Sequence, residues 1–455
     1  MPQSIFAHNV LTATGWRSNV TVLIGDDGRV SSLEDGEVAG AKLVGVLLPA
    51  LSNVHSHSFQ RAMAGLAESR GANEFDDFWT WRTLMYRFLE RLTPDDMEAI
   101  AAQVQLEMLE AGFASIGEFH YVHHQQDGSS YDAPAELTNR MLAAAETTGI
   151  GYAHLPVLYM RGGFDGAPLQ GGQRRFGCDI PRFESLYADI RTSMKGRPTD
   201  YRLGVAPHSL RAVDQAGLSF AASLCPDDPI HIHIAEQTAE VDAVKESLGA
   251  TPVQWLLDHV DVDKRWCLVH ATHMTVKETQ AAADTGSVVG VCPITEANLG
   301  DGVFDGSSYL SFGGSVAVGS DSNVRISLAE ELRMFEYSQR LRDRRRAILA
   351  DADRSCGRFL YEEMASGGAR ATGRGRGRIE PGALADLVAL DLQSPLLAGL
   401  TGDRLLDVWL FAGDDDVVME VWAAGRNVVK EGSHIRRDAI TRRFSAVMKK
   451  LRSDL

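Results

Sequence analysis

The sequence has few cysteines, no long hydrophobic run and fewer basic than acidic residues. Its 455 residues include five cysteines, and none of them forms a CxxC pair. Five scattered cysteines are too few for a disulfide framework in a chain of this length, so we expect reduced thiols and a cytoplasmic protein. No run of about 18 apolar residues occurs, which predicts that no segment spans a membrane. The start, MPQSIFAHNVLTATGW, lacks a basic stretch before an apolar core, so no signal peptide is expected.

Basic side chains are outnumbered, with 45 Lys and Arg against 61 Asp and Glu and a net charge of −16. Nucleic-acid binding needs clustered Lys and Arg that neutralise phosphates, so we do not expect nucleic acid as a partner. The basic run RLRDRRR at 340–346 is interpreted as the exposed face of a helix. An acidic protein can still bind an anionic small molecule where arginines reverse the local charge.

Both ends of the chain have the pattern of short β-strands. Near the N-terminus, VTVLIGDDGRVSSL places two apolar runs around a GDDG turn, which predicts a hairpin. Near the C-terminus, ADLVALDL, DVVMEVWAAG and RNVVKEG have similar short apolar runs between Gly and Asp residues. We therefore expect a composite β-sandwich domain formed from residues 1–48 and 367–435, with a C-terminal helix at 436–455.

Between these ends, apolar β-like segments alternate with segments that have helical periodicity. Eight such apolar segments are found, at 46–55, 113–122, 151–160, 201–210, 229–236, 265–274, 287–296 and 314–323. Nearly continuous apolar strands that alternate with helices indicate a parallel sheet covered on both faces. Eight such units predict a (β/α)8 TIM barrel over residues 49–366.

Polar residues that can take part in chemistry lie at the C-terminal ends of these expected strands. They include the pair His55 and His57, the pair His233 and Glu236, and Asp321. A barrel places its active site at that face, so the pattern supports the barrel and locates the site.

The first pair, His55-Ser56-His57, projects two imidazoles to the same side of an extended strand, as two metal ligands require. Alone, this pattern is a weak signal and fits two ordinary polar residues in a loop better than a metal site. The segment IHIHIAE adds His231 and His233, which share the same parity, so that periodicity does not choose between them. With Asp321, three imidazoles and one carboxylate make a ligand set for zinc or iron.

These motifs resemble the amidohydrolase superfamily over almost the whole chain. The matching segments are HSH after the first barrel strand, HIAE on the fifth, LVHATH on the sixth and GSDSN on the eighth. The resemblance implies His55, His57, His233 and Asp321 as metal ligands. It implies that His270 polarises the attacking water or the substrate.

The fourth expected strand ends in VAPHSL and lacks the lysine that binuclear members of the superfamily carry there, which favours one metal ion. A metal lowers the pKa of bound water toward about 7. We expect Asp321 to take a proton from this water and Glu236 to carry a proton to a substrate nitrogen. The sequence does not decide whether Glu236 or His270 delivers that proton. The alternative to a catalytic role for Glu236 is an exposed residue at the start of a helix.

A longer run, NVHSHSFQRAMAGLAE, resembles the N-formimino-L-glutamate deiminases, as do FWTWR, GEFHYVHH and APHSLRAV. The resemblance implies hydrolysis of a formimino group in histidine degradation, a dicarboxylate substrate and a homodimer. It implies five substrate-binding residues, namely Gln60, Arg82, Tyr121, His208 and Arg211. The alternative is a related deaminase of a guanidino or aminated heterocyclic substrate, and a catalytically silent binding protein is a third possibility.

Overall fold

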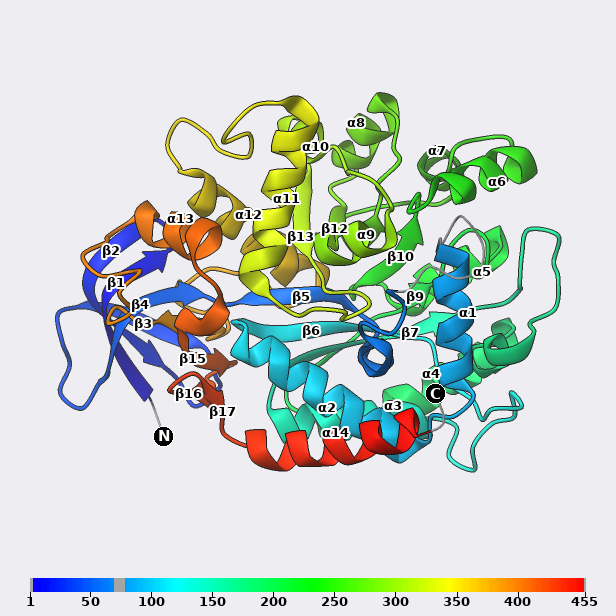
Figure 1. The fold of residues 1–455 in the computed structure, drawn as a ribbon, viewed down its shortest axis with the longest axis horizontal. Coiled ribbons are helices and arrows are strands. Elements are labelled where there is room, and N and C mark those ends of the chain that lie inside the picture. The colour runs from blue at the N-terminus through cyan, green and yellow to red at the C-terminus, as the bar shows by residue number, and fades with distance from the viewer. Residues whose placement is uncertain (1–2, 69–77, 454–455) are drawn as a thin grey trace.

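The computed structural model describes residues 3–68 and 78–453, with only the backbone at 78–80, 82 and 83. Among these residues the strands form three hydrogen-bonded sheets, one from both ends of the chain and two from its middle (Figure 1). None of the helices in the described ranges is both long and apolar enough to cross a lipid bilayer.

The terminal sheet joins the two ends of the chain in the order β17-β16-β15-β14-β4-β1-β2-β3. Its strands are β1 (Gln3–Thr12), β2 (Gly15–Ile24), β3 (Val30–Asp35), β4 (Lys42–Pro49), β14 (Leu387–Leu390), β15 (Val418–Ala423), β16 (Arg426–Lys430) and β17 (Ser433–His434). The hairpin predicted at GDDG is confirmed, because β2 and β3 pair antiparallel around it. Side chains from both ends, among them Val22, Leu47 and Trp422, share a separate hydrophobic cluster.

The middle of the chain is an α/β fold with two parallel sheets. Their strands are β5 (Leu51–Ser56), β6 (Phe113–His120), β7 (Gly151–Leu158), β8 (Arg202–Leu203), β9 (Ala206–Pro207), β10 (Ile230–Ile234), β11 (Trp266–His270), β12 (Val288–Val291) and β13 (Ser315–Val318). Every residue of β5, β6, β7 and β10 is buried, as expected for parallel strands covered on both faces. Parallel bridges Val205–Ile230 and Ser56–Asp321 connect the two sheets at both edges.

All eight predicted apolar segments contain strands, but two of them differ from a single continuous strand. Segment 46–55 covers the end of β4 and then β5, with Ala50 between them. β4 pairs antiparallel with β14, whereas β5 pairs parallel with β6, so the chain passes from the terminal sheet to a parallel sheet at Ala50. Segment 201–210 contains only the short strands β8 and β9.

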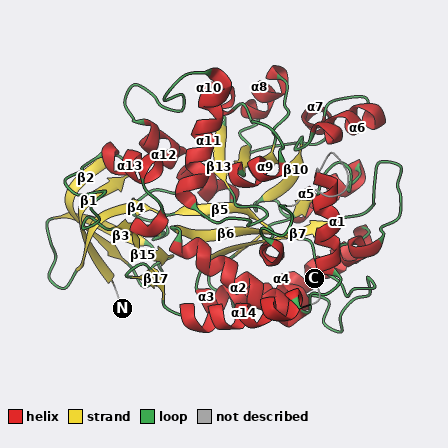
Figure 2. Cartoon of the chain, viewed as in Figure 1, coloured by secondary structure: helices red, strands yellow, loops and turns green. Residues whose placement is uncertain are grey.

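Helices lie above and below the parallel strands in the view of Figure 2. They are α1 (Phe78–Leu89), α2 (Pro94–Glu110), α3 (Glu136–Thr148), α4 (Ile180–Ser193), α5 (Gln215–Leu224), α6 (Thr238–Leu248), α7 (Pro252–His259), α8 (Val276–Asp284), α9 (Pro293–Leu299), α10 (Gly306–Ser311), α11 (Leu328–Asp343), α12 (Cys356–Ala371), α13 (Asp403–Ala412) and α14 (Arg437–Arg452). The start of α2 shows how local sequence fixes a boundary. Thr93 and Asp96 form a capping box around Pro94, which satisfies the first backbone N–H groups.

Candidate active site

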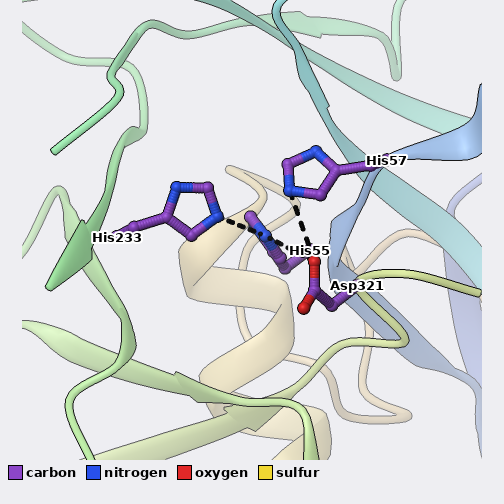
Figure 3. Close-up of side chains that lie close together, drawn as sticks. All are labelled: His55, His57, His233 and Asp321. Atoms are coloured by element: carbon purple, nitrogen blue, oxygen red, sulfur yellow. Dashed lines mark hydrogen bonds and ion pairs between the residues drawn. The ribbon is translucent and has the colours of Figure 1, made fainter. Parts of the chain in front are cut away.

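Four buried side chains from three strand ends converge on one point (Figure 3). His55 lies in β5 and His57 directly after it, His233 lies in β10, and Asp321 follows β13. Their ligand atoms, one from each residue, all lie within 4.8 Å of one another. The Nε2 atoms of His55 and His233 are 3.0 Å apart. Asp321 Oδ1 lies 3.4 Å from His55 Nε2 and 3.3 Å from His57 Nε2.

Backbone carbonyls orient two of these imidazoles. Nδ1 of His57 lies 3.1 Å from the carbonyl oxygen of Phe119, and Nδ1 of His233 lies 3.2 Å from that of His208. A ring that donates its Nδ1 proton to a carbonyl presents the Nε2 lone pair on its other side. The Nε2 atoms that face the shared point are therefore in the form that binds a metal.

The charge states of this cluster suit a cation. Burial lowers the pKa of His55 to about 3 and holds the pKa of His233 well below its usual value. Burial alone would raise the pKa of Asp321, but its hydrogen bond to His55 and the neighbouring imidazoles outweigh burial and lower it. Neutral imidazoles and an ionised carboxylate are the forms that coordinate zinc, so the residues present fit one divalent metal ion.

Backbone geometry brings these strand ends close together. At Gly319 a Cβ atom would lie 2.8 Å from the backbone nitrogen and oxygen of His55, so a larger residue would push β13 away from β5. Asp321, His270 and Ala235 adopt left-handed conformations, with φ of 43°, 66° and 52°. Such conformations cost about 1–2 kcal/mol each for residues other than glycine, and they cluster where a site requires them.

A second set of acid–base groups adjoins the metal-ligand cluster. Nε2 of His270 lies 3.8 Å from Oε1 of Glu236 and 3.9 Å from Oδ2 of Asp321. Burial raises the pKa of Glu236 to about 7. Burial lowers the pKa of His270, but Glu236, Glu296 and Asp321 outweigh it, and the pKa is raised well above its usual value. Glu236 can therefore gain and lose a proton near neutral pH.

Both sets open into a cavity of about 160 Å³. Its wall is rich in aromatic side chains, including Trp81, Tyr86, Tyr121, Tyr159, Phe164 and Phe176. Arg211 also lines the cavity, and its Nη1 donates to the Tyr159 hydroxyl at 2.8 Å. Gln60 Nε2 donates to the Tyr121 hydroxyl at 2.9 Å, while Gln60 Oε1 is buried without a hydrogen-bond partner in the described structure. Among the described residues, the cavity wall therefore contains the guanidinium of Arg211 and the side chain of Gln60, whose acceptor oxygen has no partner.

The structure brings most of the predicted site residues together. Those that line the cavity are His57, Gln60, Tyr121, His208, Arg211, His233, Glu236, His270 and Asp321. Arg82 lies in α1, and its side chain is outside the described residues. Periodicity did not distinguish His231 from His233. In the structure, Nε2 of His231 lies 2.7 Å from the carbonyl oxygen of Ala371.

Three carboxyl groups near His270 were not predicted, and two of them, those of Glu296 and Asp301, are buried. Glu240 accepts hydrogen bonds from the backbone of Ala235 and Glu236. Glu296 contacts His270 Nδ1 at 3.2 Å, and Asp301 accepts a hydrogen bond from Gln237. Burial raises the pKa of Asp301 to about 9. Their one sequence signal was position, because Glu240 comes four residues after Glu236 and Glu296 is the last residue of the seventh apolar segment.

Cys292 forms a further buried group with His270 and Asp321, whose ligand atoms also lie within 4.8 Å of one another. Burial raises the pKa of the Cys292 thiol well above its usual range, and the nearby carboxylates raise it further. A neutral thiol is a poor metal ligand. The cluster of His55, His57, His233 and Asp321 is therefore the better metal site.

Comparisons with known proteins agree with this geometry. The sequence profile of the Amidohydrolase family matches residues 46–428. Formimidoylglutamate deiminase from Pseudomonas aeruginosa is 47% identical over 98% of this chain and 99% of its own length. By contrast, 8-oxoguanine deaminase from the same organism is 25% identical over 91% of this chain and 89% of its own.

Solved structures of similar proteins have the same fold. An amidohydrolase from Brucella melitensis superposes with a TM-score of 0.94 and 44% identity, covering 99% of both chains. An adenosine deaminase from Xanthomonas campestris with bound zinc gives a TM-score of 0.83 at 19% identity, covering 99% of this chain and 98% of its own.

Proposed function

The chain belongs to the amidohydrolase family, and we propose that it hydrolyses N-formimino-L-glutamate to N-formyl-L-glutamate and ammonia. The observation that carries this proposal is a buried cluster of three imidazoles and one carboxylate that opens into the same cavity as Arg211. The high identity to a formimidoylglutamate deiminase over nearly the whole chain supports the choice of substrate. Relatives named as deaminases of heterocyclic substrates are about half as similar.

We propose that His55, His57, His233 and Asp321 hold one divalent ion, zinc in preference to iron. Three nitrogen donors and one carboxylate oxygen, all buried, support this choice. When bound, the metal acts as a Lewis acid that lowers the pKa of a water molecule and so supplies the nucleophile.

The chain's own residues then move the protons. Asp321 accepts a proton from the attacking water at Oδ2, the carboxylate oxygen nearest to His270. Water adds to the formimino carbon, and the bond from this carbon to the terminal nitrogen breaks as the added oxygen loses its second proton and becomes the formyl carbonyl. Both protons of the water thus end on the nitrogen, which leaves as ammonia. Glu236 delivers a proton to the leaving nitrogen from its half-buried carboxyl group, and His270 orients the water or the substrate through Nε2.

The two carboxylates of the substrate require cationic and hydrogen-bonding partners. Arg211 is held by the Tyr159 hydroxyl, and a guanidinium binds a carboxylate in a fixed geometry. Gln60, Tyr121 and His208 line the same cavity and supply further hydrogen-bonding groups. We propose these four residues as substrate contacts, together with Arg82 on the basis of the sequence resemblance.

The same proposal extends to architecture and context. The bridges at both edges of the two parallel sheets support a (β/α)8 barrel over residues 49–366. The separate cluster formed by both chain ends supports a composite β-sandwich from 1–48 and 367–435, with 436–455 as a C-terminal helix. All five cysteines are free and buried, which supports a reducing, cytoplasmic location. We expect a homodimer that acts in histidine degradation.

Ammonia release from a panel of substrates tests the proposed reaction. N-formimino-L-glutamate should release one ammonia per N-formyl-L-glutamate formed, because its carboxylates meet Arg211 and its formimino carbon meets the metal-ligand cluster. Guanine, cytosine and N-formyl-L-glutamate should release none. Turnover of either base without turnover of N-formimino-L-glutamate would instead identify the protein as a heterocycle deaminase.

A further inference from the structure

Glu296 is a buried carboxyl group on α9 that contacts Nδ1 of His270, the ring nitrogen opposite the one nearest to Glu236 and Asp321. Its Oε1 atom lies 3.2 Å from Nδ1 of His270 and accepts a hydrogen bond from the backbone N–H of Cys292 at 2.8 Å. The residue is 6% exposed and does not line the cavity. It therefore contacts a proposed catalytic group without reaching the substrate.

We propose that Glu296 is a positioning residue that fixes the ring of His270, an inference that rests on the proposed function. A ring whose Nδ1–H donates to a carboxylate is held in one tautomer and one orientation. The opposite nitrogen, Nε2, then faces Oε1 of Glu236 and Oδ2 of Asp321 at 3.8 and 3.9 Å. Without Glu296 the ring is free to rotate about its Cβ–Cγ bond and present a carbon to these groups.

The left-handed backbone at His270 gives this contact added weight. His270 is the last residue of β11 and has a φ of 66°, and Ala271 after it has a φ of 50°. The left-handed backbone fixes the position from which the His270 side chain projects. The hydrogen bond to Glu296 Oε1 fixes the rotation of the ring about the Cβ–Cγ bond. Both features act on the same side chain, which lies 1% exposed beside the metal-ligand cluster.

A purely structural role for Glu296 has a matched control in a second carboxyl group at the same end of α9, which comes from α11. Glu296 accepts from Cys292, at the start of α9, and Glu331 of α11 accepts from the N–H of Ile294 at 2.9 Å. Both carboxyl groups satisfy a backbone N–H at the N-terminal end of α9, and both are buried. Of these two groups, only Glu296 has a hydrogen bond to His270.

Steady-state kinetics of three variants tests the proposal. Glu296→Ala should lower kcat for N-formimino-L-glutamate by about 10–100-fold, with KM changed by less than about 3-fold, because residues behind an active-site group typically have effects of this size. Glu331→Ala should change kcat by less than about 3-fold. Glu296→Gln should recover most of the activity, since the Cys292 N–H orients the amide so that its oxygen faces His270.

A double-mutant cycle separates positioning from folding. If Glu296 acts through His270, Glu296→Ala should cost less than about 3-fold in a His270→Asn background. An equal cost in both backgrounds, or an equal cost for Glu296→Ala and Glu331→Ala, would overturn the proposal. Metal content and circular dichroism are measured for each variant. If Glu296→Ala does not fold, Glu296→Asp replaces it, with the same expected loss. An inactive wild-type protein would contradict the proposed function rather than this inference.

Discussion

Replacing Asp321 with asparagine is expected to lower kcat for N-formimino-L-glutamate by about 10³-fold or more while the protein still folds. The carboxylate uses both oxygens, because Oδ1 faces His55 and His57 and Oδ2 faces His270. Asparagine keeps one oxygen and cannot accept a proton from water at neutral pH. The variant therefore loses the proposed proton acceptor and one charge of the metal site.

The backbone at Asp321 makes asparagine the appropriate replacement. Its φ of 43° lies in the left-handed region, which asparagine tolerates about as well as aspartate. Two backbone hydrogen bonds of 2.9 Å hold Asp321 at the end of β5. The Asp321 N–H donates to the carbonyl of His55, and the His57 N–H donates to the carbonyl of Asp321, so neither bond involves the Asp321 side chain. Circular dichroism should be unchanged, and ammonia release should be lost. A fully active variant would show that the assigned proton acceptor is wrong.

Replacing Glu236 with glutamine should lower kcat by about 10²–10⁴-fold and change KM much less. Burial raises the pKa of Glu236 to about 7, so the carboxyl group gains and loses a proton easily near neutral pH, whereas an amide cannot. Because Glu236 is not a proposed metal ligand, the variant should keep a full equivalent of metal. Rates are measured by ammonia release, and metal content by elemental analysis.

Glu246→Gln provides the control for this charge change. Glu246 lies on the exposed side of α6, the helix that follows Glu236, and lines none of the described cavity. The control should have wild-type kcat. If Glu236→Gln were equally active, the proton would have to reach the leaving nitrogen by another group, and His270 would be the next candidate.

The parallel strands could be predicted from sequence because burial on both faces leaves nearly continuous apolar runs. The same continuous apolar pattern conceals the point at which the chain passes from one sheet to another. Residues 46–51 (VLLPAL) are apolar across the junction, yet β4 belongs to the terminal sheet and β5 to a parallel sheet. No change of residue type marks the transition at Ala50, because both strands are buried on either side of it.

The metal-ligand cluster was predictable only in part. His231 and His233 share the same parity on β10, so spacing alone does not separate them, and the contact of His231 with Ala371 of α12 is a tertiary one. Glu296 is the last residue of the apolar segment 287–296 and shows no pattern of its own, because its partner His270 lies 26 positions earlier. Side chains that act through long-range contacts carry no local pattern.

Metal content and activity, measured together on one preparation, test the proposed site most directly. Metal-free protein is titrated with zinc, and ammonia release from N-formimino-L-glutamate is followed at each step. Activity should rise with bound metal and reach its maximum at about one equivalent per chain, as four ligands around one point require. His233→Asn should bind metal weakly and stay inactive. His231→Asn, two residues earlier on the same strand, should still bind one equivalent. Full activity without metal, or equal metal binding by both variants, would contradict the assignment of this cluster.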